Sequence, residues 1–189
     1  MSALRDDALR VLQRWSAPDG RQERLRQEYV GHLQRHPDGT SRDCYPDHLT
    51  AGALIVSADR SQVLLTLHAK AREWFQMGGH CEPGDTTLAG AALREAREES
   101  GVGQLALDPV PVHLDLHEVP FCGGRGLVRH LDVRFVATAP EGSEHAVSDE
   151  SLDVRWWPVH ALPTGAEDMR ALVARALERL QTRSSSAII

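Results

Sequence analysis

Three glutamates that follow a glycine-rich turn are the residues of this 189-residue chain whose spacing best suits chemistry. Glu95, Glu98 and Glu99 have the i, i+3, i+4 spacing that brings side chains together on one face of a helix. Carboxylates so close repel one another, so the arrangement gains from a cation between them. Oxygen ligands of this kind suit Mg²⁺ or Mn²⁺, which also bind the phosphate oxygens of a substrate. A solvated acidic helix end is the alternative interpretation of these three residues taken alone.

The turn before the glutamates favours the metal interpretation. Gly78 and Gly79 let the backbone approach a ligand closely, and Pro83-Gly84 predicts a turn before the helix begins. The order of these features along the chain is more informative than any one of them. Together they predict a site that holds a divalent metal against a phosphate.

This segment resembles the Nudix box, G-x5-E-x7-R-E-U-x-E-E-x-G-U, in which U is an aliphatic residue. The following residues match its leading glycine and its second half: Gly79, Arg94, Glu95, Glu98, Glu99, Gly101 and Val102. Two departures fall in the first half, because Asp85 replaces the family's glutamate and eight residues, not seven, separate it from Arg94. In the family that glutamate pairs with the box arginine, so the Asp85 to Arg94 pair is the contact that these departures affect. The metal-binding half is intact, and activity is expected to survive.

The resemblance to MutT-like Nudix hydrolases implies the α/β fold of that superfamily, an α/β/α sandwich, here with an N-terminal helical extension. It implies a metal-dependent hydrolase that cleaves the diphosphate bond of a nucleoside diphosphate linked to another moiety. The implied cofactor is Mg²⁺ or Mn²⁺, held by the Gly78 carbonyl and by Glu95, Glu98 and Glu99. Water attacks one phosphorus in this chemistry, so no covalent enzyme intermediate is expected.

A base must activate that water, and family members supply it either from the box or from a later loop. Glu98 is the box candidate. Glu150 is the candidate in a later loop, with Glu144 and Asp149 as weaker rivals, although a surface acid explains Glu150 equally well.

Arginines complete the expected site. The resemblance implies that Arg94 orients the box glutamates and does not touch substrate. Arg125 and Arg129, which follow the flexible Gly123-Gly124, could reach a terminal phosphate, and a mobile surface loop explains them as well.

Two other functions stay open at this stage. A Nudix-type isopentenyl-diphosphate isomerase shares the fold and places a cysteine near this turn, where Cys81 lies. A non-catalytic Nudix-like module that senses a nucleotide would use the N-terminal helices as a partner surface. The intact glutamates favour hydrolysis over both.

Periodicity predicts the elements that must position these residues. Apolar residues at helical spacing predict helices at 2–15 and 21–34, the box helix, and a helix around residues 169–180. Alternation predicts strands at 48–57, 62–67, 74–77, 110–119, 127–138 and 154–157. The expected organisation is an extension at 1–45, a Nudix domain at 46–183 and a disordered tail at 184–189.

Histidines form a second pattern. Polar residues alternate with apolar ones in two strands, and the polar residues are His113, Asp115 and His117 in one and His130, Asp132 and Arg134 in the other. If the strands are neighbours, these faces align as a solvent-facing surface, the favoured interpretation, or line a cleft or a subunit contact. A metal site on these histidines or on His80 is the least favoured interpretation.

Composition bounds the remaining possibilities. A net charge of -6 argues against nucleic-acid binding, and 41% hydrophobic residues suit one sizeable core. The three cysteines, Cys44, Cys81 and Cys122, lack C-x-x-C spacing, which favours reduced thiols in the cytoplasm. No segment has the length of a membrane span. A small-molecule nucleotide or diphosphate is the expected partner, and a homodimer, common in the family, is left open.

Overall fold

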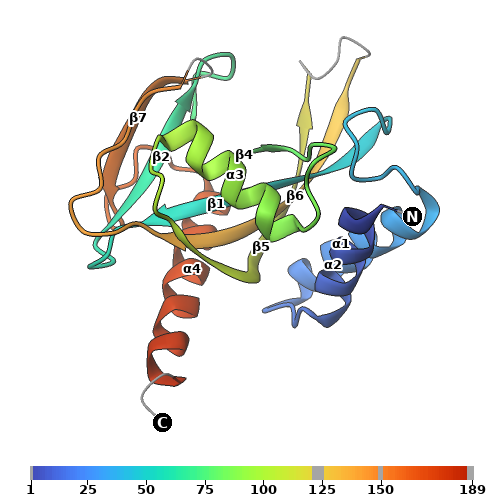
Figure 1. Ribbon diagram of the computed structural model, residues 1–189, viewed down its shortest axis with the longest axis horizontal. Helices are drawn as coiled ribbons and strands as arrows, with labels where there is room; N and C mark the ends of the chain where they lie inside the picture. The colour runs from blue at the N-terminus through green and yellow to red at the C-terminus, as the bar shows by residue number, and fades with distance from the viewer. Residues whose placement is uncertain (1, 121–125, 149–150, 187–189) are drawn as a thin grey trace.

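The computed structural model of the protein describes residues 2–120, 126–148 and 151–186. Its helices are α1 (Ala3–Arg14), α2 (Gly20–Arg35), α3 (Leu88–Ser100) and α4 (Glu167–Ser186). Its strands are β1 (Asp47–Val56), β2 (Gln62–His68), β3 (Trp74–Phe75), β4 (Met77–His80), β5 (Ala106–Val119), β6 (Val128–Thr138) and β7 (Ser151–Pro158). Figure 1 shows α1 and α2 side by side at one end of the molecule, with α3 lying across the sheet.

The predicted elements are confirmed, with shifts at their ends and two larger differences. The segment 74–77 is divided between β3 and β4, which pair with different strands, β2 and β1. α4 continues to Ser186, into the segment expected to be a disordered tail, while residues 187–189 lie outside the described residues.

One seven-stranded sheet organises the fold in the order β3-β2-β1-β6-β5, with β4 paired to β1 and β7 paired to β2. β1 runs parallel to β6 and antiparallel to β2 and β4. The middle of β1 pairs with β4, from Thr50 opposite His80 to Ala53 opposite Met77, and its last residues pair with β2. The glycine turn is therefore held against the central strand.

Alternation along β1 supplies two cores on opposite faces of the sheet. Leu49 and Ala51 join a core shared with α1, α2 and α3. Leu54 and Val56 join a second core with α4, in which Leu172 is fully buried. Helices thus cover both faces, as expected for an α/β/α sandwich of the Nudix type, and α1 and α2 precede the sheet as expected for the extension.

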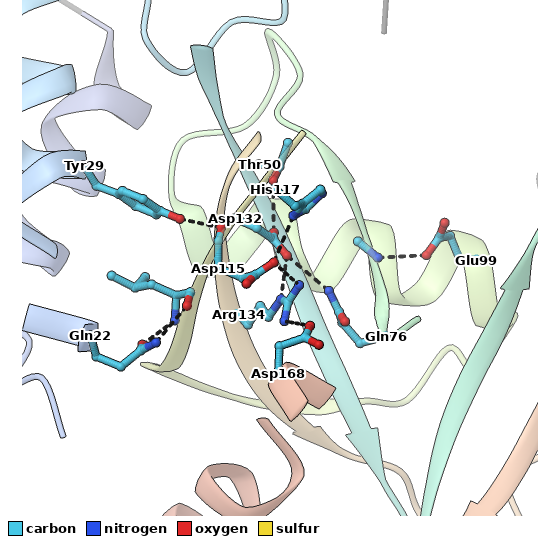
Figure 2. A network of polar contacts seen from close by, with 12 residues as sticks. Gln22, Tyr29, Thr50, Gln76, Glu99, Asp115, His117, Asp132, Arg134 and Asp168 are labelled. Carbon is cyan, nitrogen blue, oxygen red and sulfur yellow. Dashed lines mark hydrogen bonds and ion pairs between the residues drawn. The ribbon is translucent and has the colours of Figure 1, made fainter. Parts of the chain in front are cut away.

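The two N-terminal helices are bonded to later elements. The Gln22 side chain donates to the Leu114 carbonyl of β5 at 2.9 Å and accepts from the Leu114 N–H at 2.7 Å (Figure 2). In α1, the buried Asp7 carboxylate accepts from the N–H of Leu88, the first residue of α3, at 2.9 Å. The N-terminal helices therefore contact both the sheet and the helix that carries the glutamates.

Among the helices of the described ranges, none combines the length and the apolar character needed to cross a membrane.

Candidate active site

The helix of the glutamates, α3, is fixed at both ends and along one face. The Thr87 hydroxyl accepts from the Gly90 N–H at 3.0 Å and caps the first turn, and Gly101 ends the helix in the left-handed conformation, at φ +72°. Small and apolar residues of α3 are fully buried against the sheet: Leu88, Ala91, Ala92 and Ala96. This close packing sets the helix, and with it the glutamates, directly against β4 and β1.

The glycine turn in β4 touches two of the carboxylates. The Gly78 N–H donates to Glu99 Oε2 at 2.8 Å (Figure 2). A Cβ atom on Gly79 would lie 2.8 Å from Glu95 Oε2, closer than real Cβ contacts. The Glu95 carboxylate therefore occupies the space that a side chain at position 79 would fill, and it would have to shift to admit one.

Arg94 joins the turn to the glutamates. Its guanidinium donates to both Asp85 oxygens, at 3.0 and 3.3 Å, and to Glu95 and Glu98, at 2.9 Å each. It also donates to the His80 carbonyl at 2.9 Å. The Asp85 to Arg94 pair is thus present despite the shorter acid and the extra residue. The hydrogen bonds to Asp85 and then to Glu95 raise the pKa of Arg94, so it remains a fixed cation.

We call Asp85, Glu95, Glu98 and Glu99, together with Arg94, the carboxylate cluster. Three of its carboxylates contact the guanidinium and the fourth, Glu99, is held by the Gly78 N–H, so negative charge is in excess. The Glu98 side chain is 58% exposed, whereas those of Asp85 and Glu95 are 9% and 14% exposed. This donor set of carboxylate oxygens, open to solvent on one side, fits a hard divalent cation that also binds a phosphate.

Arg129, expected at a terminal phosphate, is engaged elsewhere. It is bonded to Asp47 through two guanidinium nitrogens, the Nε contact measuring 2.9 Å, and its Nη1 lies 3.6 Å from Glu28 of α2. These contacts hold its guanidinium on the side of the sheet that α2 covers.

Three other candidates, Arg125, Glu150 and its rival Asp149, lie outside the described residues. Glu144 is described and is exposed in the segment between β6 and β7. The structure therefore leaves the choice between a box base and a later-loop base as a prediction.

The polar faces of β5 and β6 are aligned as expected, but four of their six polar residues are buried. His113 lies opposite Arg134, and Asp115 lies opposite Asp132. Arg134 donates to Asp132 at 2.7 Å, to Asp115 at 3.0 Å and to Asp168 of α4 at 3.3 Å (Figure 2). The expectation of a solvent-facing surface is wrong for the four strand residues, whose exposure is 2–7%, because α4 and its Asp168 lie over this face.

Burial sets the ionisation of this face. Desolvation lowers the pKa of His113 to about 4, and desolvation with repulsion from neighbouring histidines lowers that of His130 to about 3. Burial alone would raise the pKa of Asp115, but the hydrogen bond with His117 and the charge of Arg134 lower it to about 2. At neutral pH the face therefore combines the neutral imidazoles of His113 and His130 with paired charges.

Two polar residues on this face escape sequence reasoning. Gln76, between β3 and β4, donates to Asp132 at 3.1 Å. His48 of β1 lies beside His80 and His130, with ring centroids 4.9–5.1 Å apart. We call these three histidines the imidazole cluster. Alternation of His48 with the apolar residues of its strand is the signal that could have found it.

The part of the chain that contains the carboxylate cluster resembles known proteins. A family model described as NUDIX domain matches residues 46–176. A NUDIX family hydrolase from Clostridium perfringens is 27% identical, with a TM-score of 0.55, and the match covers 70% of this chain and 97% of that one. No curated protein matches the chain.

Two more distant structures share the fold. An Ap4A hydrolase from C. elegans, in a binary complex, is 19% identical with a TM-score of 0.59, over 71% of this chain and 98% of that one. The E. coli dihydroneopterin triphosphate pyrophosphohydrolase is 19% identical with a TM-score of 0.54, over 69% and 95%.

The segment matched by the family model contains β1, the glycine turn of β4 and the whole of α3, and hence every member of the carboxylate cluster. α1 and α2 precede it. By this match, which spans more than half of its length, the chain belongs to the NUDIX domain family and is a Nudix-type pyrophosphohydrolase.

Proposed function

We propose that the protein is a Mg²⁺- or Mn²⁺-dependent hydrolase of a nucleoside diphosphate linked to another moiety. The observation that carries the proposal is the carboxylate cluster, in which Arg94 holds Glu95 and Glu98 beside the glycine turn. Glu95, Glu98, Glu99 and the Gly78 carbonyl would hold the metal. When bound, the metal neutralises charge on the diphosphate oxygens and lowers the pKa of bound water.

The chain's own groups divide the remaining work. Glu99, fixed by the Gly78 N–H and only 9% exposed, is a positioned anion. Glu98 is the most exposed of the box glutamates and is our candidate for the base that takes a proton from the attacking water. Glu150, with Glu144 and Asp149, remains the proposed alternative. Arg94 orients both Glu95 and Glu98, and it stays protonated, so it cannot act as the base.

Substrate choice rests on groups outside the box. We propose that Arg125 and Arg129 bind a terminal phosphate, in which case the phosphate takes the place of Asp47 on Arg129. The names of the Ap4A hydrolase and of the dihydroneopterin triphosphate pyrophosphohydrolase motivate the inclusion of dinucleotides and of pterin and nucleoside triphosphates in a substrate screen. We propose a small-molecule partner, no nucleic acid, a cytoplasmic location and a homodimer as the state to test.

The position of Cys81 argues against the isomerase. Cys81 is 7% exposed and belongs to the core under α3, and burial raises the pKa of its thiol to about 12. A thiol in this state is neither ionised nor accessible to a substrate carbon. The non-catalytic alternative is disfavoured because the metal-binding half of the box, Glu95, Glu98 and Glu99, is intact.

The test is a phosphate-release screen over a nucleotide library with Mg²⁺ and with Mn²⁺, on the wild type and on Glu98→Gln. We expect the substitution to lower turnover by about 10²–10⁴-fold, the usual contribution of a general base. Glu82→Gln is the matched control, because Glu82 also lies near Arg94, at 3.9 Å, but is 63% exposed and outside the cluster. Wild-type turnover by Glu98→Gln would refute the assignment of the base, and absence of turnover by the wild type on every compound would refute the function.

A further inference from the structure

Three strands bring three imidazoles together on the face of the sheet opposite α3. His48 of β1 is paired with His130 of the parallel strand β6, and His80 of β4 is paired with Thr50, two residues further along β1. One ring nitrogen from each histidine lies within 4.8 Å of one from each of the others. These contacts come from residues far apart in the sequence, so the regular sheet, and not a mobile loop, sets their positions.

The surroundings of two of these rings, those of His48 and His130, suit them to act as metal ligands. His48 is 1% exposed, and its Nδ1 lies 3.2 Å from the Cys44 carbonyl. A carbonyl only accepts, so Nδ1 carries the proton and the lone pair lies on Nε2, the pattern of a metal-binding histidine whose second nitrogen is held by the backbone. The Nε2 atom of His130 is buried and has no hydrogen-bond partner among the described residues. Such a buried polar atom is costly unless something binds it.

We propose that the imidazole cluster, His48, His80 and His130, binds a transition metal of the class that prefers nitrogen ligands, with Zn²⁺ the foremost candidate. Zn²⁺ takes histidine nitrogens at about 2.0–2.1 Å in tetrahedral geometry, which places the nitrogens about 3.3 Å apart. The nitrogens lie within 4.8 Å of one another, so metal binding would require them to approach by up to about 1.5 Å. Three protein ligands leave a fourth position for water or another ligand.

The metal site is distinct from the carboxylate cluster, yet it is connected to it. The His80 ring belongs to the imidazole cluster, whereas its carbonyl accepts from Arg94 at 2.9 Å. A metal bound by the ring would therefore fix the same stretch of backbone that Arg94 holds from the other side.

A second group must be separated from this one by experiment. His36, Asp38 and Cys44 also have ligand atoms within 4.8 Å of one another. Asp38 is exposed in the turn that follows α2, and burial of the Cys44 thiol, together with nearby Asp38, raises its pKa to about 11. A metal there would show a sulfur ligand, whereas the imidazole cluster offers nitrogen only.

The first experiment uses the wild-type protein alone. The metal-free protein is titrated with Zn²⁺ by calorimetry in the presence of excess Mg²⁺, and the one-equivalent complex is measured by zinc X-ray absorption. We expect one tight site that Mg²⁺ does not displace, with three imidazole nitrogens at about 2.0–2.1 Å. A sulfur ligand at about 2.3 Å, displacement by Mg²⁺ or the absence of tight binding would each overturn the proposal.

The second experiment places the site by substitution. His130→Gln and, separately, His48→Gln should weaken Zn²⁺ binding by at least about 100-fold, since even residues that only support a ligand cost 10–100-fold in affinity. His36→Gln is the matched control and should bind Zn²⁺ like the wild type. Circular dichroism of each metal-free variant establishes that it is folded. Loss of binding in His36→Gln, or wild-type binding in folded His130→Gln and His48→Gln, would contradict the proposal.

Discussion

The two faces of the sheet carry different chemical groups at the short strand β4, carboxylates on one side and imidazoles on the other. In β4, Gly79 faces α3, where the Glu95 carboxylate fills the space of a side chain. The next residue, His80, points to the other face and belongs to the imidazole cluster. Neighbouring residues of a strand point to opposite sides, so a single step along the backbone separates oxygen donors from nitrogen donors.

The faces also differ in the exposure and the pairing of their charged side chains. On the α3 face the carboxylates lie near solvent and share Arg94, with Glu98 58% exposed. On the α4 face Arg134 is 2% exposed and pairs with two buried carboxylates. The charged groups of one face are thus accessible to solvent, whereas those of the other are enclosed and paired with one another.

Removal of Arg134 should have the largest effect, because it acts on the enclosed face. Arg134→Met leaves the buried Asp115 and Asp132 without their cation and should lower the free energy of unfolding by about 3–5 kcal/mol. Urea denaturation measures this. Arg175→Met is the control, since the pairs of Arg175 with Asp19 and Glu178 lie at the surface, and should cost less than about 1 kcal/mol. Equal losses in the two variants would remove the distinction between the faces.

Acid should weaken the same face through His113. Its folded pKa of about 4 lies below the ordinary value of 6.5, so between these values the unfolded chain binds the extra proton. The stability that neutral His113 contributes is present above pH 6.5 and is lost as the pH falls towards 4, by about 3 kcal/mol. Urea denaturation at pH 7, 5 and 4 should show a smaller fall in His113→Gln than in the wild type. His145→Gln, at an exposed position, is the matched control.

On the α3 face, loss of one carboxylate should affect turnover. Glu99→Gln removes a proposed metal ligand and the charge that accepts from the Gly78 N–H, so we expect kcat/KM to fall at least about 100-fold, equivalent to about 2.7 kcal/mol. Zn²⁺ binding at the imidazole cluster should be retained. Glu178→Gln, on the exposed side of α4, is the control. Loss of Zn²⁺ binding in Glu99→Gln would show that one site, and not two, takes both metals.

Substitution of Asp85, the residue that departs from the Nudix box, should have the smallest effect. Asp85→Asn removes one of the charges that hold Arg94 but leaves its bonds to Glu95 and Glu98. We expect kcat to fall about tenfold, equal to about 1.4 kcal/mol, while Asp85→Glu, which restores the residue of the family pattern, should keep most of the activity. A loss as large as that of Glu99→Gln would mean that the turn and the glutamates act as one unit.

The elements of the fold were predictable because alternation and helical spacing are local. The spacing of Glu95, Glu98 and Glu99 likewise determined their common helix face. Burial of Asp115 and Asp132 was not predictable, since it depends on where α4 packs. The position of His48 depends on the parallel register of β1 with β6, which no local pattern encodes.

The hydrogen bonds between Gln22 and Leu114 have a further consequence. β5 is the last strand in the sheet order, so one side of its backbone has no strand partner in the described structure. The carboxamide of Gln22 takes the place of a neighbouring strand by satisfying both the N–H and the C=O of one residue. Exposed strand edges promote pairing between molecules. α2 therefore covers part of this edge, and we expect removal of the first helices to expose it to pairing between molecules.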